Sequence, residues 1–161
     1  MSNMLRPPSL GPIVGHTTAS TVRVWMRGAV ADENRTVGIA ALYLADKLVK
    51  GSIKPLRLQR EYDRTGYVDY DGLKAETRYT VRMGSLSIDT VDPDITEYDD
   101  QKIFDSLPPL DLLEKELHEL PDDEALAQVR TFPAKAAKTL SFVFGSCRYP
   151  GILWTKNRRP N

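Results

Sequence analysis

Cysteine is nearly missing from this chain, since Cys147 is the only one among its 161 residues. One cysteine excludes an intrachain disulfide framework. No apolar run reaches the roughly 20 residues that a membrane-spanning helix needs. The amino-terminal residues MSNMLRPPSLGP contain neither an apolar core nor a small-residue cleavage site, so they do not predict a signal peptide. We therefore expect a soluble protein without a membrane partner, either cytoplasmic or exported with its signal absent from this sequence.

The chain also has no formal net charge, because 22 Lys and Arg residues offset 22 Asp and Glu residues. A balanced charge gives no reason to expect binding to nucleic acid. The balance is uneven along the chain: 14 acidic residues lie between Asp89 and Glu124, where Lys102 and Lys115 are the only lysines or arginines. This acidic segment is either a solvated loop or an insert that packs on a basic face of the domain.

What the chain does have is a series of short strand patterns between residues 11 and 88. Residues 11–18 predict a first strand, and residues 21–28 alternate with the period of two that is typical of a half-buried strand. Residues 36–44 are apolar on both faces and predict a central strand, and residues 54–62 alternate again. The inward side chains are expected to be Val22, Val24, Met26, Leu56 and Leu58, with Arg23, Trp25 and Arg27 on the opposite face of the second strand.

The segment GLKAETRYTVRMG, residues 72–84, also alternates and places Tyr79 two residues after Thr77 at the entry to a strand. This arrangement is typical of a tyrosine corner, in which the ring packs in the core and the hydroxyl bonds to the backbone a few residues upstream. The alternative is a tyrosine that merely alternates inward. Many short strands with turns at this spacing favour a mainly β fold, an immunoglobulin or fibronectin III-like antiparallel β-sandwich with a helical acidic insert.

The insert, at about residues 85–128, is too long for a structureless loop in a compact domain. An apolar stripe in it predicts a helix that ends at Pro121, and a second short helix is predicted to start with Asp122 as N-cap and run to about Val129. We expect the acidic side chains to meet arginines on the outer face of the sheet and to cover Trp25 there. The stripe is Leu110, Leu113, Leu117 and Leu120, and the arginines are Arg23, Arg27, Arg78 and Arg82.

The end of the chain changes in character. Residues 129–134 predict the last strand of a sandwich domain that covers residues 1–134, and residues 135–161 are expected to hold a linker and the first strand of a truncated second domain. The stretch TLSFVFGSC, residues 139–147, has consecutive apolar side chains, as strands buried on both faces of an α/β sheet do. Without parallel neighbours, this strand is expected to be disordered, to pair with a sheet edge, or to join another copy of the chain as a homo-oligomer.

Three segments together resemble a known family. They are LGPIVGHTTASTVRVWMRG near the start, GLKAETRYTVRMG in the middle, and RTFPA followed by LSFVFGSCRYPG at the end. Their order and spacing resemble the N-terminal part of the PhoD-like alkaline phosphatases and phosphodiesterases, the alkaline phosphatase D family. That family usually has a leading fibronectin-like sandwich, a short linker and a metallophosphatase core. The resemblance covers most of the chain except the acidic insert.

The resemblance implies a metal ligand at Cys147. In this family the catalytic core opens with a strand that ends in a Ser-Cys pair, which Ser146 and Cys147 match, and a thiolate suits iron. The parent enzyme would hold a dinuclear centre, iron with calcium or similar divalent ions, completed by Asp, Tyr, Asn and His residues downstream. This chain has no Asp-x-x-Tyr or Gly-Asn-His motif, and its two histidines, His16 and His118, are expected to be structural or exposed. We therefore expect no catalytic residue and no cofactor in this chain by itself.

The expected function is that of a non-catalytic accessory domain of a metal-dependent phosphatase or phosphodiesterase. Its partner would be the catalytic domain of the parent chain, which would bind the phosphate ester. The outer face near Trp25 and the end near Pro133 are the candidate contact surfaces. The alternative is an independent sandwich module that binds a carbohydrate or a protein, because one fold supports many functions. The strand pattern at 139–147 favours the first interpretation, since a free-standing module has no use for it.

Overall fold

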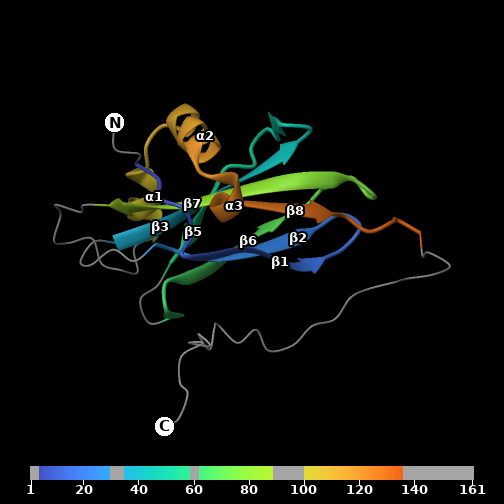
Figure 1. Cartoon of the computed structure of the whole chain (residues 1–161), viewed down its shortest axis with the longest axis horizontal. Coiled ribbons are helices and arrows are strands. Elements are labelled where there is room, and N and C mark those ends of the chain that lie inside the picture. The colour runs from blue at the N-terminus through green and yellow to red at the C-terminus, as the bar shows by residue number, and fades with distance from the viewer. Residues whose placement is uncertain (1–3, 30–34, 59–61, 89–99, 136–161) are drawn as a thin grey trace, which may run out of the picture.

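The computed structural model describes residues 4–29, 35–58, 62–88 and 100–135, which form two antiparallel sheets packed face to face (Figure 1). This arrangement confirms the predicted mainly β sandwich. One sheet has the order β1 (Leu10–Thr17), β2 (Val22–Arg27), β6 (Thr65–Tyr70). The other has the order β4 (Lys47–Leu48), β3 (Arg35–Leu44), β7 (Arg78–Ile88), β8 (Leu126–Arg130), and β5 (Lys54–Arg57) also pairs with β3. Strand β1 lies against β8 and β5 lies against β6, so the two sheets meet along both sides.

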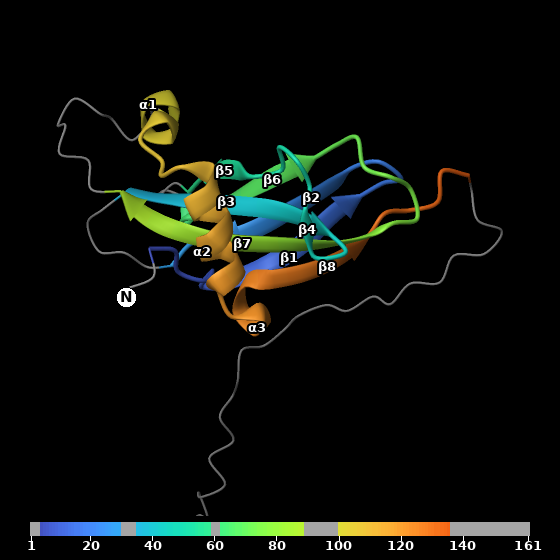
Figure 2. The same ribbon diagram turned by 90° about the horizontal axis from the view of Figure 1, so that it is seen from above.

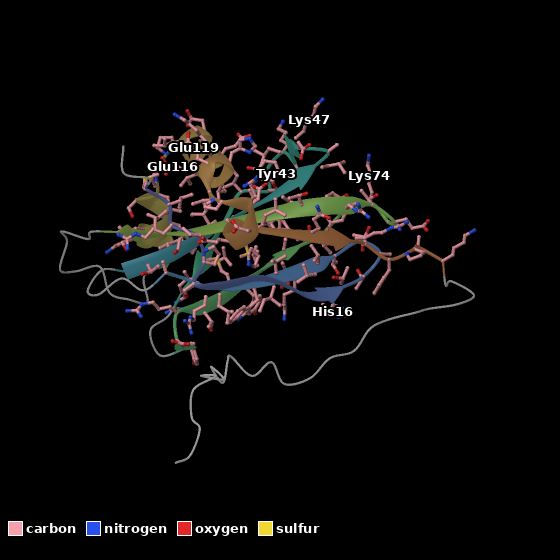
Figure 3. The ribbon with its side chains drawn as sticks, in the orientation of Figure 1. His16, Tyr43, Lys47, Lys74, Glu116 and Glu119 are labelled. Atoms are coloured by element: carbon pink, nitrogen blue, oxygen red, sulfur yellow. The ribbon has the colours of Figure 1, made fainter. Side chains whose placement is uncertain are left out.

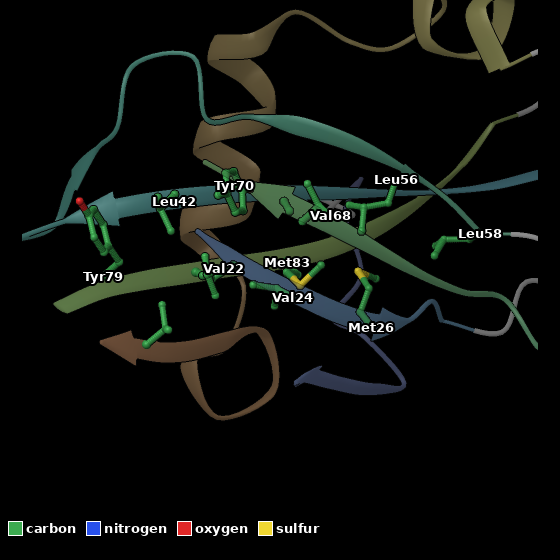
Figure 4. Close-up of a cluster of buried hydrophobic side chains, with 13 residues drawn as sticks. Val22, Val24, Met26, Leu42, Leu56, Leu58, Val68, Tyr70, Tyr79 and Met83 are labelled. Atoms are coloured by element: carbon green, nitrogen blue, oxygen red, sulfur yellow. The ribbon is translucent and has the colours of Figure 1, made fainter. Parts of the chain in front are cut away.

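The main core fills the space between the two sheets (Figure 4). Alternation along each strand sends every second side chain into this space, as the period of two requires. The predicted inward residues are confirmed, because all five are buried. The cluster consists of Val22, Val24, Met26, Ala40, Leu42, Leu56, Leu58, Val68, Tyr70, Tyr79, Val81, Met83 and Val129.

A third layer covers the outer face of the five-stranded sheet. It consists of α2 (Leu110–Glu119), which crosses over β3 and β7 (Figure 2). Helix α1 (Asp100–Asp105) precedes α2 beside the sheet, and α3 (Asp122–Ala125) follows it against β7 and β1. A second cluster lies beneath α2, which is why β3 is buried on both faces as predicted. Gly84 of β7 permits the close contact, because a Cβ there would stand 2.7 Å from Leu120 Cδ1. The cluster consists of Leu5, Val37, Ile39, Ala41, Tyr43, Leu86, Leu113, Leu117, Leu120 and Ala125.

The acidic helix also holds the amino-terminal segment against the sheet. Glu116 Oε2 accepts hydrogen bonds from the backbone N–H groups of Met4 at 2.8 Å and Leu5 at 3.1 Å. Arg6 and Ser85 exchange two backbone hydrogen bonds beside them. One carboxylate of the acidic segment is therefore used for a structural contact rather than left to solvent.

Several details differ from the sequence-based prediction. Leu110 is 64% exposed, because it is the first residue of α2 and this turn lies on the β5 side of β3, before the helix crosses β3 and β7 (Figure 2). Strands β4 and β6 were not predicted. Helix α3 has Pro121 rather than Asp122 as its N-cap, and it ends at Ala125 because the chain extends into β8 from Leu126. Strand β7 continues to Ile88, and β8 covers Leu126–Arg130 rather than the predicted residues 129–134. The segment between these two strands is therefore shorter than the predicted residues 85–128.

Candidate interaction surfaces

The end of the sandwich where the described chain stops is tied together around Thr131. This residue is buried, and its hydroxyl donates to the carbonyl of Lys74 at 2.6 Å and accepts from the N–H of Thr77 at 3.0 Å. The hydroxyl of Tyr79 accepts a hydrogen bond from the N–H of Lys74 at 2.9 Å. Tyr79 is itself part of the main core, so the predicted tyrosine corner is confirmed. Sequence reasoning did not find Thr131, because its partners are distant in the chain.

The same end joins the turn between β1 and β2 to the residues after β8. The N–H of Phe132 donates to the carbonyl of Thr18 at 2.9 Å, and the carbonyl of Phe132 accepts from the N–H of Glu76 at 3.2 Å. The N–H of Leu73 donates to the carbonyl of Ser20 at 2.9 Å. The side chain of Phe132 is left 51% exposed beside this network. Parts of all three segments that carry the family resemblance therefore meet at one end of the domain.

A second surface is the outer face of the three-stranded sheet. Cα pairing places Ile13 opposite Trp25 and Trp25 opposite Tyr67, so the three side chains form one row across the strands. Ile13 is 47% exposed, Tyr67 is 56% exposed and Trp25 is half-buried. No described helix lies over this sheet, whereas α2 covers the outer face of the other sheet (Figure 1). The row is therefore an exposed apolar feature of this face.

Charged groups flank the row and neutralise each other locally. Both nitrogens of the Arg23 fork donate to the Asp69 carboxylate at 2.7 Å, and the guanidinium lies 4.1 Å from the centre of the Tyr67 ring. The hydrogen bond from Arg23 lowers the pKa of the Asp69 carboxyl below its ordinary value. Arg27 pairs with Asp63 at 3.2 Å. The face therefore combines an apolar row with ion pairs, and it carries little uncompensated charge from these groups.

The expected contact between the acidic insert and four arginines is correct for one of them. Arg82 is buried under α2, donates to the carbonyl of Leu120 at 3.2 Å, and forms an ion pair with Asp122. Arg23 and Arg27 belong to the other sheet and pair there with aspartates, so the prediction is wrong for them. Trp25 shares that sheet, and none of the described helices of the insert lies over it (Figure 1). Arg78 is exposed at the start of β7. Alternation places the arginines on faces, but it does not say which sheet each strand joins.

Cys147, the predicted metal ligand, lies outside the described residues, as does the stretch 139–147. Within residues 4–29, 35–58, 62–88 and 100–135, no group of three or more His, Cys, Asp or Glu side chains could hold a metal ion. His16 and His118 are exposed, as expected. None of the helices in the described part of the chain is long and apolar enough to cross a membrane.

Comparison with known proteins yields a weak likeness to solved structures. No protein-family model matches the chain, and no curated protein matches it. A solved structure described as "Structure of PhoD" is 19% identical, with a TM-score of 0.38. The likeness covers 48% of this chain and 16% of that structure, so this chain matches well under a fifth of its length.

Proposed function

We propose that this chain is the non-catalytic accessory domain, of immunoglobulin or fibronectin III type, of a metal-dependent phosphatase or phosphodiesterase. The observation that carries the proposal is the meeting of the three resembling segments at one end of the sandwich. There the backbone of Phe132 bonds to Thr18 and Glu76, and Thr131 bonds to Lys74 and Thr77. The catalytic domain would follow in the chain beyond this end. A hydrogen-bond network anchored on the buried Thr131 would fix the point where the chain leaves the sandwich, as an accessory domain needs if it is to hold a set orientation.

The outer face of the three-stranded sheet is the surface we propose to pack on the catalytic domain. Ile13, Trp25 and Tyr67 form an apolar row on a face that no described helix covers. Aromatic residues and arginine are enriched in the buried centres of protein interfaces, and this face offers both. The paired charges beside the row suit an interface, because each guanidinium already has its carboxylate.

The chemistry of the parent enzyme would reside beyond the described residues. Hydrolysis of a phosphate ester by such a centre needs metal-activated water and positive charge on the phosphoryl oxygens. The Cys147 thiolate would supply one ligand for iron, and calcium or a similar divalent ion would take oxygen ligands from residues downstream of this chain. The described residues would position the catalytic domain and would supply no ligand to the metals.

The first test is an activity assay of this chain with p-nitrophenyl phosphate and bis-p-nitrophenyl phosphate, with iron, calcium and manganese supplied in turn. A Cys147→Ala variant is the control. We expect no turnover above that control, because one thiolate leaves most ligand positions empty. Metal-dependent turnover that the variant loses would overturn the non-catalytic assignment.

The second test concerns the packing surface and uses a longer chain that includes the downstream catalytic domain. Trp25→Ser in the apolar row should separate the unfolding transitions of the two domains in calorimetry and lower the kcat/KM of the enzyme. Leu110→Ser is the control, because Leu110 is an exposed apolar residue on the opposite side of the sandwich. If both variants behave alike, the three-stranded sheet does not pack on the catalytic domain.

The alternative function, an independent module that binds a carbohydrate, is favoured by one observation. Trp25 and Tyr67 lie side by side on an uncovered sheet face, and aromatic rings in such positions can stack on sugar rings. Arg23 already lies over the Tyr67 ring, which leaves Trp25 as the available platform. Titration of this chain with oligosaccharides would change the Trp25 fluorescence if this function were correct. A Trp154→Phe background removes the second tryptophan from the signal.

A further inference from the structure

A groove lies between α2 and the turn that joins β3 to β4. Its volume is about 320 Å³, and it is lined by Tyr43, Asp46, Asp111, Glu114, Lys115 and His118. The four helical residues are spaced at i, i+3, i+4 and i+7, so they share one face of α2. Tyr43 and α2, which line the groove, are on the outer side of the five-stranded sheet, away from β2, which carries Trp25 (Figures 1 and 3). The groove would stay accessible if a catalytic domain covered the apolar row that contains Trp25. Binding of a ligand in the groove can therefore be tested independently of the proposed function.

Tyr43 forms the buried part of the groove. Only 5% of this residue is exposed, and its hydroxyl has no hydrogen-bond partner among the described residues. The great majority of buried polar groups in proteins are hydrogen-bonded, so an unpaired hydroxyl beside a groove indicates a missing partner. Burial, and then the charge of the Glu114 carboxylate, raise the pKa of the Tyr43 hydroxyl. The group therefore stays neutral and can accept a hydrogen bond as well as donate one.

The charges around the groove favour a cation. Asp46, Asp111 and Glu114 supply three carboxylates, whereas Lys115 is the one lysine in the lining and has Glu119 as a partner at 3.9 Å. A bare metal ion is a poor candidate, because the described residues include no group of His, Cys, Asp and Glu that could hold one. A ligand with several N–H donors would match a hydroxyl and carboxylates that accept. A guanidinium has five such donors in a fixed plane and is always charged.

We propose that this groove binds a guanidinium group, which would donate hydrogen bonds to the Tyr43 hydroxyl and to the carboxylates of Glu114 and Asp111. The group can belong to a free small molecule or to an arginine side chain of a peptide. Glu114 and Asp111 are three residues apart on α2 and reach the groove from the helix. Asp46 reaches it from the turn after β3, so the ligand would be held from two elements.

The test is calorimetric titration of this chain with two probes, butylguanidinium and the blocked peptide Gly-Arg-Gly. We expect saturable binding of at least one probe and a Kd about tenfold weaker in Tyr43→Phe, which corresponds to a loss of about 1.4 kcal/mol. Tyr43→Phe keeps the ring and removes only the unpaired hydroxyl, so the variant should fold and should unfold at a higher temperature than the parent chain. Glu114→Gln should weaken binding as well.

Asp123→Asn is the matched control for charge, because Asp123 is an exposed carboxylate that does not line the groove. Its Kd should equal that of the unchanged chain. Tighter binding of the peptide would identify the source as an arginine of a protein, and tighter binding of butylguanidinium would identify a small molecule. Absence of saturable binding for both probes would overturn the proposal. Equal weakening by Asp123→Asn and Glu114→Gln would also overturn it, because it would indicate attraction to net charge alone.

Discussion

The packing of α2 on the sheet can be tested with two leucines of one helix. Leu117 is fully buried in the cluster between α2 and the five-stranded sheet, whereas Leu110 is 64% exposed on the first turn. Leu117→Ala removes buried carbon atoms and leaves a cavity beneath the helix, which costs about 2–5 kcal/mol. Leu110→Ala removes the same atoms from a largely exposed position and should change the free energy of unfolding by less than about 0.5 kcal/mol.

Urea unfolding measures both effects. With a slope of about 2 kcal/mol per molar urea, the loss predicted for Leu117→Ala lowers the midpoint by about 1–2.5 M. The midpoint for Leu110→Ala should stay within about 0.3 M of the unchanged chain. The slope should be the same in all three proteins, because a changed slope indicates a changed denatured state or lost two-state behaviour. Equal midpoint shifts for the two variants would refute the placement of α2 described above.

Three further predictions concern the polar contacts. Tyr79→Phe removes the acceptor of the Lys74 N–H and should cost about 1–3 kcal/mol in urea unfolding; a loss below about 0.5 kcal/mol would contradict a structural role of the corner. Arg82→Ala should cost more than Asp122→Asn, because the arginine is buried and the aspartate side chain is 72% exposed; small and equal losses of both variants in thermal unfolding would contradict the burial of Arg82. The pKa of the Asp69 carboxyl is lower in the folded chain than in the unfolded chain. The ionised carboxylate therefore stabilises the folded chain above the unfolded pKa of about 3.9, and this contribution is lost as pH falls through the pKa of the folded chain. Asp69→Asn should therefore be less stable by under about 1 kcal/mol at pH 7 and equal to the unchanged chain at low pH, as unfolding over a pH series can measure.

Much of the fold could be predicted because strand alternation is a local property. Val22, Val24 and Met26 alternate with polar residues, and all three are buried in the main core. The segment 36–44 is apolar on both faces and is buried on both, since a second sheet covers one face and α2 the other. The short strand β6 was missed although Val68 and Tyr70 alternate with exposed residues, because it contains Gly66 and Asp69, two residue types that are depleted in strands.

The candidate sites were less predictable, because they depend on which elements become neighbours. The corner at Tyr79 could be predicted, since its partner Lys74 is five residues away in the chain. Thr131 could not, since its hydroxyl bonds to residues more than 50 positions earlier. The groove at Tyr43 is lined by residues of β3 and of α2, which begins 67 residues after Tyr43. No local sequence pattern indicates that these two elements are neighbours.

The sequence by itself determined the class of the fold and the inward face of most strands, because alternation and apolar periodicity act over a few residues. It also determined that Arg23 and Arg27 share one face of β2 and that Leu113 and Leu117 share one face of α2. Only the tertiary structure decided that Arg23 meets Asp69 while Arg82 meets Asp122. These ion pairs depend on which sheet each strand joins. The paired residues are about 40 or more positions apart, so they meet only when the whole chain has packed.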